Sequence, residues 1–144
     1  MNLRHISNST MKTLKRFDYQ LQKSEIEGNI LRPVIEIELE SAEGLWISTN
    51  AIVDTGADYT TLNMKYAKVL GIDLENLREV KGRGIGGRVK GYFVEDVRTK
   101  INDCVLNIPV LFLKFPLNLL GRRGILEKYD LLFKKDYGEI KIRE

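Results

Sequence analysis

The sequence predicts an all-β protein, a closed β-barrel or sandwich with one or two short helices. Between residues 34 and 40, Ile35, Ile37 and Leu39 alternate with three glutamates, which is typical of a strand with one buried face. Short apolar runs of this kind recur between turn signals roughly every 8 to 12 residues, as in barrels and sandwiches. With 144 residues, 43% of them apolar and 30% charged, the chain matches one ordinary globular domain.

The domain is expected to span residues 30–144. Residues 1–29 show poor periodicity, and we expect them to form an N-terminal arm that is partly flexible. The single cysteine, Cys104, excludes an internal disulfide and favours a reducing, cytoplasmic location. No apolar run is long enough to cross a bilayer, so we expect a soluble protein without a membrane partner.

The elements follow from local signals. The strand at 34–40 turns at 41–44, and residues 45–53 return as a second strand. Thr60 or Thr61 can cap a short helix that runs through Leu70 and ends at Gly71. Pro109 indicates an edge strand or a bulge in the strand 105–113. Residues 79–81 lead toward the glycines. Further strands are expected at 89–100, 129–133 and 139–142, the last two as a terminal hairpin, with a brief helix at 124–128.

The apolar run 51–53 leads directly into Asp54, Thr55 and Gly56. A carboxylate at the end of a buried strand needs a partner, because an isolated buried charge is costly. Two interpretations are open from the residues alone: Asp54 caps the backbone of its own turn, or it carries chemistry. The only histidine, His5, lies in the arm, which excludes Ser-His-Asp and Cys-His catalysis and leaves no usual zinc cluster. Carboxylates are the remaining catalytic groups.

Three motifs carry a resemblance to a known family. The string Asp54-Thr55-Gly56-Ala57-Asp58 resembles the active-site loop of retropepsins, the retroviral-type aspartic proteases. The segment 116–122, with Leu119-Leu120-Gly121-Arg122, is similar to the second signature of that family, and the glycines at 82–87 resemble its flap tip. The motifs occur in family order over roughly residues 33–126, and the layout is most similar to chromosomal, prokaryote-type members.

The resemblance implies a retropepsin-like fold with one Asp-Thr-Gly lobe per chain. Asp54 is then the catalytic residue, and a homodimer supplies the second carboxylate of a proton-sharing pair. Thr55 would bond its counterpart across the dimer, although a turn threonine that bonds its own backbone is the alternative. Gly56 and Asp58 would contact substrate, with Asp58 also paired to Arg122, and Leu120, Gly121 and Arg122 would support the loop.

Ala57 stands where pepsins usually carry a hydroxyl residue. Without that hydroxyl the carboxylate pair lacks one hydrogen bond that favours its charged form, so we expect activity at about pH 5 to 7.

By the same resemblance Gly84, Ile85, Gly86 and Gly87 form the flap. The pattern Gly82-x-Gly84-x-x-Gly87 also fits a dinucleotide-binding loop. That alternative requires a buried strand before the glycines and a helix after them, whereas the residues that follow favour a strand.

The sequence thus predicts an aspartic endopeptidase that acts on peptides or proteins with no cofactor and no metal. A catalytically inactive dimeric peptide-binding module with the same fold is the alternative. A basic nucleic-acid-binding barrel is a further one, but a net charge of +3 makes nucleic acid an unexpected partner. The helix after Asp54 and the hairpin after Leu126 depart from the viral layout, so the way two subunits join is left open.

Overall fold

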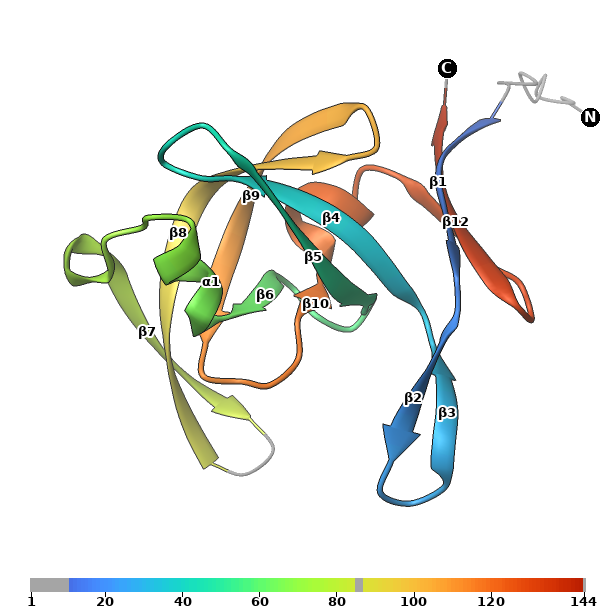
Figure 1. Cartoon of the computed structure of the whole chain (residues 1–144), viewed down its shortest axis with the longest axis horizontal. Helices are drawn as coiled ribbons and strands as arrows, with labels where there is room; N and C mark the ends of the chain where they lie inside the picture. The colour runs from blue at the N-terminus through green and yellow to red at the C-terminus, as the bar shows by residue number, and fades with distance from the viewer. Residues whose placement is uncertain (1–10, 85–86, 144) are drawn as a thin grey trace, which may run out of the picture.

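The computed structural model describes residues 11–84 and 87–143, without the side chains of 82–88 and 143, and it is built almost entirely of β-strands (Figure 1). The largest sheet has seven strands in the order β4-β5-β10-β6-β9-β8-β7. These strands are β4 (Val34–Glu40), β5 (Trp46–Val53), β6 (Thr60–Asn63), β7 (Arg78–Gly84), β8 (Gly87–Ile101), β9 (Cys104–Leu113) and β10 (Leu119–Leu120). The expected all-β class is confirmed.

Pairing between β4 and β8 closes the sheet into a ring of hydrogen-bonded strands. Glu38 lies opposite Lys100 and Leu39 opposite Thr99. Strand β7 lies outside the ring and pairs only with β8 in the described chain, so the two form a hairpin that extends from it (Figure 1). A closed ring leaves few unpaired edges, and the hairpin strand β7 is one of them.

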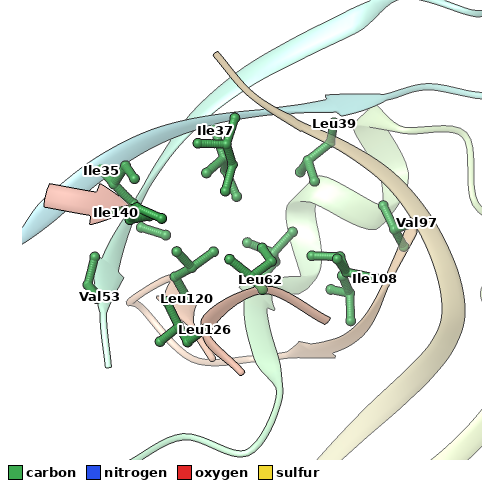
Figure 2. Close-up of a cluster of buried hydrophobic side chains, with 14 of the residues drawn as sticks. Ile35, Ile37, Leu39, Val53, Leu62, Val97, Ile108, Leu120, Leu126 and Ile140 are labelled. Atoms are coloured by element: carbon green, nitrogen blue, oxygen red, sulfur yellow. The ribbon is translucent and has the colours of Figure 1, made fainter. Parts of the chain in front are cut away.

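The core fills the interior of the ring (Figure 2). The predicted alternation of β4 is confirmed, because Ile35, Ile37 and Leu39 are each at most 1% exposed. Strand β9 contributes Ile108, Val110 and Phe112 at the same spacing of two, all fully buried. Burial of such side chains stabilises a fold by about 1.5–3 kcal/mol each.

A second sheet combines the first strand of the described chain with its last two, in the order β1-β12-β11. The expected terminal hairpin is confirmed as β11 (Asp130–Phe133) and β12 (Tyr137–Arg143). Strand β1 (Met11–Asp18) pairs along β12, and its Phe17 is 4% exposed against Gly138. Regular pairing of this stretch was not expected from its poor periodicity. The first ten residues of the predicted arm lie outside the described residues, and a domain boundary at residue 29 stays a prediction.

Strands β2 (Gln20–Ser24) and β3 (Gly28–Arg32) form a separate two-stranded hairpin. It projects from the point where β1 and β4 diverge, and it extends toward the lower edge of Figure 1, as the β7–β8 hairpin does.

The predicted helix begins later than expected. Residues 60–63 form β6, which runs parallel to β9, and helix α1 spans Met64–Val69. Its cap is Asn63, whose side chain accepts from the Lys65 N–H at 3.0 Å, so the expected cap at Thr60 or Thr61 was wrong. Pairing with β9 holds both threonines in a strand. The predicted end at Gly71 is confirmed by its φ of +73°, which favours glycine.

Two further local predictions have distinct outcomes. Pro109 lies in a strand between β6 and β8, so it is not at an edge, but β8 bulges between Val94 and Val97 directly opposite it. The expected helix at 124–128 is an irregular turn at Arg122–Leu126, because Arg123 and Gly124 have non-helical dihedral angles. A 3-10 turn at Leu74–Asn76 completes the chain.

No helix in the described part of the chain has the length and apolar character needed to cross a membrane.

Candidate active site

Asp54 follows the last residue of β5, at the point where β5 runs parallel to β10. The register places Leu119 beside Ile52 and Leu120 beside Val53. The Asp54 N–H donates to the Leu120 carbonyl at 3.0 Å. The backbone of this aspartate is therefore fixed by the strand that carries the second sequence motif.

The carboxylate of Asp54 caps its own turn. The Gly56 N–H donates to Asp54 Oδ1 at 2.9 Å, and the Ala57 N–H donates to the Asp54 carbonyl at 3.2 Å. The capping interpretation from the sequence is thus confirmed. It does not compete with a chemical role, because a carboxylate has two oxygens with several acceptor positions and the side chain is half-buried.

The rest of the loop is turned toward solvent. Thr55, Gly56 and Asp58 are exposed and Ala57 is half-buried. The backbone after Asp54 is tied to the second motif, since the Arg122 N–H donates to the Ala57 carbonyl at 2.9 Å. The two predicted signatures therefore form one hydrogen-bonded unit.

Asp58 and Arg122 lie together, but not as predicted. Both line a hollow of about 340 Å³ with Tyr59, Arg123 and Glu127. No ion pair joins Asp58 to Arg122 among the residues that the structure describes; the link between the segments is the Arg123 N–H, which donates to the Asp58 carbonyl at 2.8 Å. Arg123 instead approaches Glu127 at 3.9 Å.

Gly121 is required for the close approach of the two motifs. A Cβ atom at this position would lie 2.3 Å from the Tyr59 carbonyl carbon and 2.6 Å from the Thr60 nitrogen. Its N–H donates to Thr60 Oγ1 at 3.1 Å. The φ of Gly121 is −98°, so lack of space and not backbone conformation selects glycine here.

Asn118 is a structural residue that the sequence did not single out. Its amide nitrogen donates to Thr49 Oγ1 at 3.1 Å and to the Asn50 carbonyl at 3.0 Å. Its amide oxygen accepts from the Asn63 N–H at 2.9 Å. One side chain thus joins β5 to β6 beside the Asp54 loop. The sequence signal that could have identified Asn118 is its position, as a polar residue directly before the apolar pair 119–120.

Two of the residues predicted for the flap, Gly84 and Gly87, lie in the β7–β8 hairpin. Gly84 pairs with Gly87 at its end, whereas Ile85 and Gly86 lie outside the described residues. The dinucleotide alternative is excluded, because the residues after the glycines form strand β8 and not a helix.

The base of this hairpin contacts the Asp54 loop. The rings of Phe93 on β8 and Tyr59 meet edge to face, with centroids 5.3 Å apart. On the same hairpin Lys90 and Glu79 pair at 3.4 Å, and the hydrogen bond to Glu79 raises the pKa of Lys90 above its ordinary value. The charge of Lys90 is therefore partly neutralised by a cross-strand partner.

Cys104 is the first residue of β9, and its side chain contacts Tyr129. Its thiol is 3.4 Å from the Tyr129 hydroxyl, and burial, with this hydrogen bond, raises the pKa of Tyr129 to about 12. A group of three or more metal-ligating side chains is absent from the described ranges 11–84 and 87–143.

The Asp-Thr-Gly loop is hydrogen-bonded to the apolar-Gly-Arg segment within a closed ring of strands, which is the arrangement that the sequence predicted for an aspartic protease. The chain belongs to the aspartyl protease family, of the retropepsin-like clan: the family profile described as aspartyl protease matches residues 41–126, more than half of the chain. The match contains Asp54, the β7–β8 hairpin and the segment 119–122. No curated protein matches the sequence closely enough to be counted as a relative.

Proposed function

We propose that the chain is an aspartic endopeptidase that works as a homodimer, with Asp54 of each subunit forming the catalytic pair. The observation that carries the proposal is the Asp54 loop itself. It presents a half-buried carboxylate, oriented by the Gly56 N–H at 2.9 Å, on a backbone clamped to Leu120 at 3.0 Å. Catalytic groups need this kind of fixed placement.

The second carboxylate comes from a second copy of the chain. The sequence contains one Asp-Thr-Gly, and carboxylate-based hydrolysis needs two carboxyl groups that share a proton. A two-fold axis beside Asp54 supplies the pair, since a C2 interface brings the same residue of both subunits together. Thr55 is exposed next to Asp54 and would bond its counterpart at such an axis.

Each carboxyl group has one role in the reaction. The ionised member accepts a proton from water while the oxygen of that water attacks the carbonyl carbon of the peptide. The protonated member donates a hydrogen bond to the carbonyl oxygen. The proton taken from the water then passes from that carboxyl group to the amide nitrogen, the C–N bond breaks, and the amine leaves.

The substrate is an extended peptide held between the loop and the β7–β8 hairpin. Strand β7 ends the sheet, so its outer edge offers backbone groups of the kind that pair with a peptide strand. The exposed Gly56 and Asp58 line the opposite side of the path. Gly84, Ile85, Gly86 and Gly87 would cover the bound peptide, and closure of such a hairpin excludes bulk water while the attacking water molecule stays between the carboxyl groups. A reducing, cytoplasmic location is proposed from the free thiol of Cys104.

The test replaces Asp54 by asparagine. Asp54→Asn keeps the shape and the acceptor for the Gly56 N–H but removes the ionisable group, so cleavage of a peptide library should fall to background. Asp103→Asn, at an exposed turn far along the chain from the loop, is the matched control and should cleave as the wild type does. Products are identified by mass spectrometry.

Turnover by Asp54→Asn at the wild-type rate would contradict the proposal. Tight peptide binding by the wild type without any cleavage would instead identify an inactive peptide-binding module.

A further inference from the structure

The β2–β3 hairpin is the part of the fold that the monomer leaves without support. Its two strands pair with each other through five residue pairs, from Gln20–Arg32 to Ser24–Gly28, and with no other strand of the described chain. At about 3.3 Å per residue, each strand extends about 16 Å from the body. An isolated two-stranded hairpin is at best marginally stable in water, so a hairpin of this length needs a surface to pack on.

One face of this hairpin is apolar and exposed. Leu21 and Leu31 are directly opposite each other and therefore lie on the same face, with 64% and 55% of their surface exposed. Ile26 stands at the tip and is 93% exposed. The turn that carries it is held by Ser24, whose Oγ accepts from the Ile26 N–H at 3.3 Å. Three large apolar side chains on one small exposed element indicate a contact surface.

The base of the hairpin is anchored at the end of the strand that carries Asp54. Directly after β3, the carbonyl of Pro33 accepts from the Val53 N–H at 2.8 Å, one residue before Asp54. Val34 then pairs with Ile52. The hairpin therefore starts from the same end of β5 as the Asp54 loop, which is where a second subunit has to lie if two Asp54 side chains are to meet.

The charges at the tip also fit a second copy of this chain. Glu25 and Glu27 flank Ile26 and are exposed. The Asp54 side of the protein presents exposed cations, among them Arg122 beside the loop, and Arg78, which lies opposite Phe93 at the base of the β7–β8 hairpin. A two-fold assembly about Asp54 brings acidic tips toward basic partner surfaces, and opposite charges favour association.

We infer that the β2–β3 hairpin is a dimerisation arm, which packs its Leu21–Leu31 face and its Ile26 tip against the second subunit of the Asp54 dimer. The inference rests on the proposed function for the position of the second subunit. The binding partner of the arm is a second copy of the chain, and this copy supplies the second Asp54 of the catalytic pair.

The first experiment measures dimer dissociation by sedimentation equilibrium. Leu31→Arg places a charge in the apolar face and should raise the dimer dissociation constant about tenfold or more, because a charge in an interface core removes the contact of a central residue. Leu45→Arg is the matched control, since Leu45 is 59% exposed on the turn between β4 and β5, and it should dissociate as the wild type does. Glu25→Lys with Glu27→Lys should also weaken the dimer, more strongly at low salt than at high salt.

Equal dissociation constants for Leu31→Arg, Leu45→Arg and the wild type would overturn the inference, as would a wild type that stays monomeric at every concentration. The mass of the particle is measured without substrate, so a wild-type dimer that cleaves no peptide would end the peptidase proposal and leave the test of the arm intact.

A second measurement does not depend on the folding of Leu31→Arg. In a Cys104→Ser background, Ile26→Cys supplies a single thiol, which is labelled with benzophenone. The side chain of Ile26 is 93% exposed, so the label is accessible. Isotope-labelled and unlabelled chains, both carrying the label, are mixed and exposed to light, which activates the benzophenone. Cross-links between labelled and unlabelled copies support the arm. Cross-links confined to single chains would overturn it.

Discussion

At the scale of single residues, the site depends on positions where one atom more would not fit. Gly121 is the clearest case, because a Cβ there would lie 2.3 Å from the Tyr59 carbonyl carbon. The contact is with backbone, so it cannot be relieved by a rotamer change. The glycine of the second motif thus acts by allowing the two motifs to touch.

We predict that Gly121→Ala lowers the free energy of unfolding by about 1–3 kcal/mol, as overpacking does, and also reduces kcat because Asp54 moves with its loop. Gly44→Ala is the control: its Cβ would meet open space, but its φ is +81°, so it should cost stability through backbone strain alone. Chemical denaturation and peptide turnover separate the two effects. Unchanged kcat in folded Gly121→Ala would show that the contact does not position the catalytic loop.

Ala57 permits a test of the pH dependence. Ala57→Thr adds a hydroxyl next to the carboxylate pair, where a hydrogen bond would favour the charged form. The acid limb of the kcat/KM profile should therefore move to lower pH. Ala57→Val has nearly the same shape without the hydroxyl and should leave the limb near its wild-type position. A shift of equal size in both variants would assign the effect to shape.

At the scale of elements, the short strands around the loop are held by side chains as much as by their own ladders. Strand β10 has two residues, yet it lies between β5 and β6. Asn118, directly before it, bonds Thr49 and Asn50 on β5 and the Asn63 N–H on β6. This one carboxamide therefore adds to the backbone hydrogen bonds that hold the Asp54 loop beside Leu120 and Arg122.

We predict that Asn118→Ala reduces the free energy of unfolding by about 3 kcal/mol, because it leaves partly buried donors and acceptors without partners. Peptidase activity should fall further than the loss of folded protein accounts for. Asn107→Ala, at an exposed position on β9, should be close to neutral. Thermal and urea unfolding measure the stability change, and a neutral Asn118→Ala would contradict the assigned role.

At the scale of the whole molecule, the first and the last strand of the described chain pair with each other. Strand β1 pairs with β12, and the ring of Phe17 packs so closely on Gly138 that a Cβ there would lie 2.2 Å from it. Phe17 belongs to the same buried cluster as Ile35 and Ile140. The N-terminal strand is thus part of the core and not an accessory to it.

Phe17→Ala should lower the free energy of unfolding by about 3–5 kcal/mol, the usual cost of a buried phenylalanine. Leu45→Ala, at a position 59% exposed, should have little effect. Denaturant titration of the two variants gives the comparison. A small loss for Phe17→Ala would mean that β1 is loosely held, as expected for an arm.

The features that the local sequence predicted correctly are those that depend on residues close together in the chain. The alternation of β4, the end of α1 at Gly71, the hairpin β11–β12 and the loop at Asp54 each follow from neighbours within a few residues. The motifs 54–58 and 119–122 led to the family that the comparison confirms. The flap glycines and the catalytic role of Asp54 stay predictions for the experiments above.

Tertiary structure alone decided which distant segments meet. A two-residue strand such as β10 has no periodicity to detect, and Thr60 and Thr61 become strand residues because β9 lies beside them. The pairing of β1 with β12, and of Phe17 with Gly138, joins positions more than a hundred residues apart. Such contacts are selected by burial and backbone pairing in the closed fold, which a local pattern of apolar and polar residues does not contain.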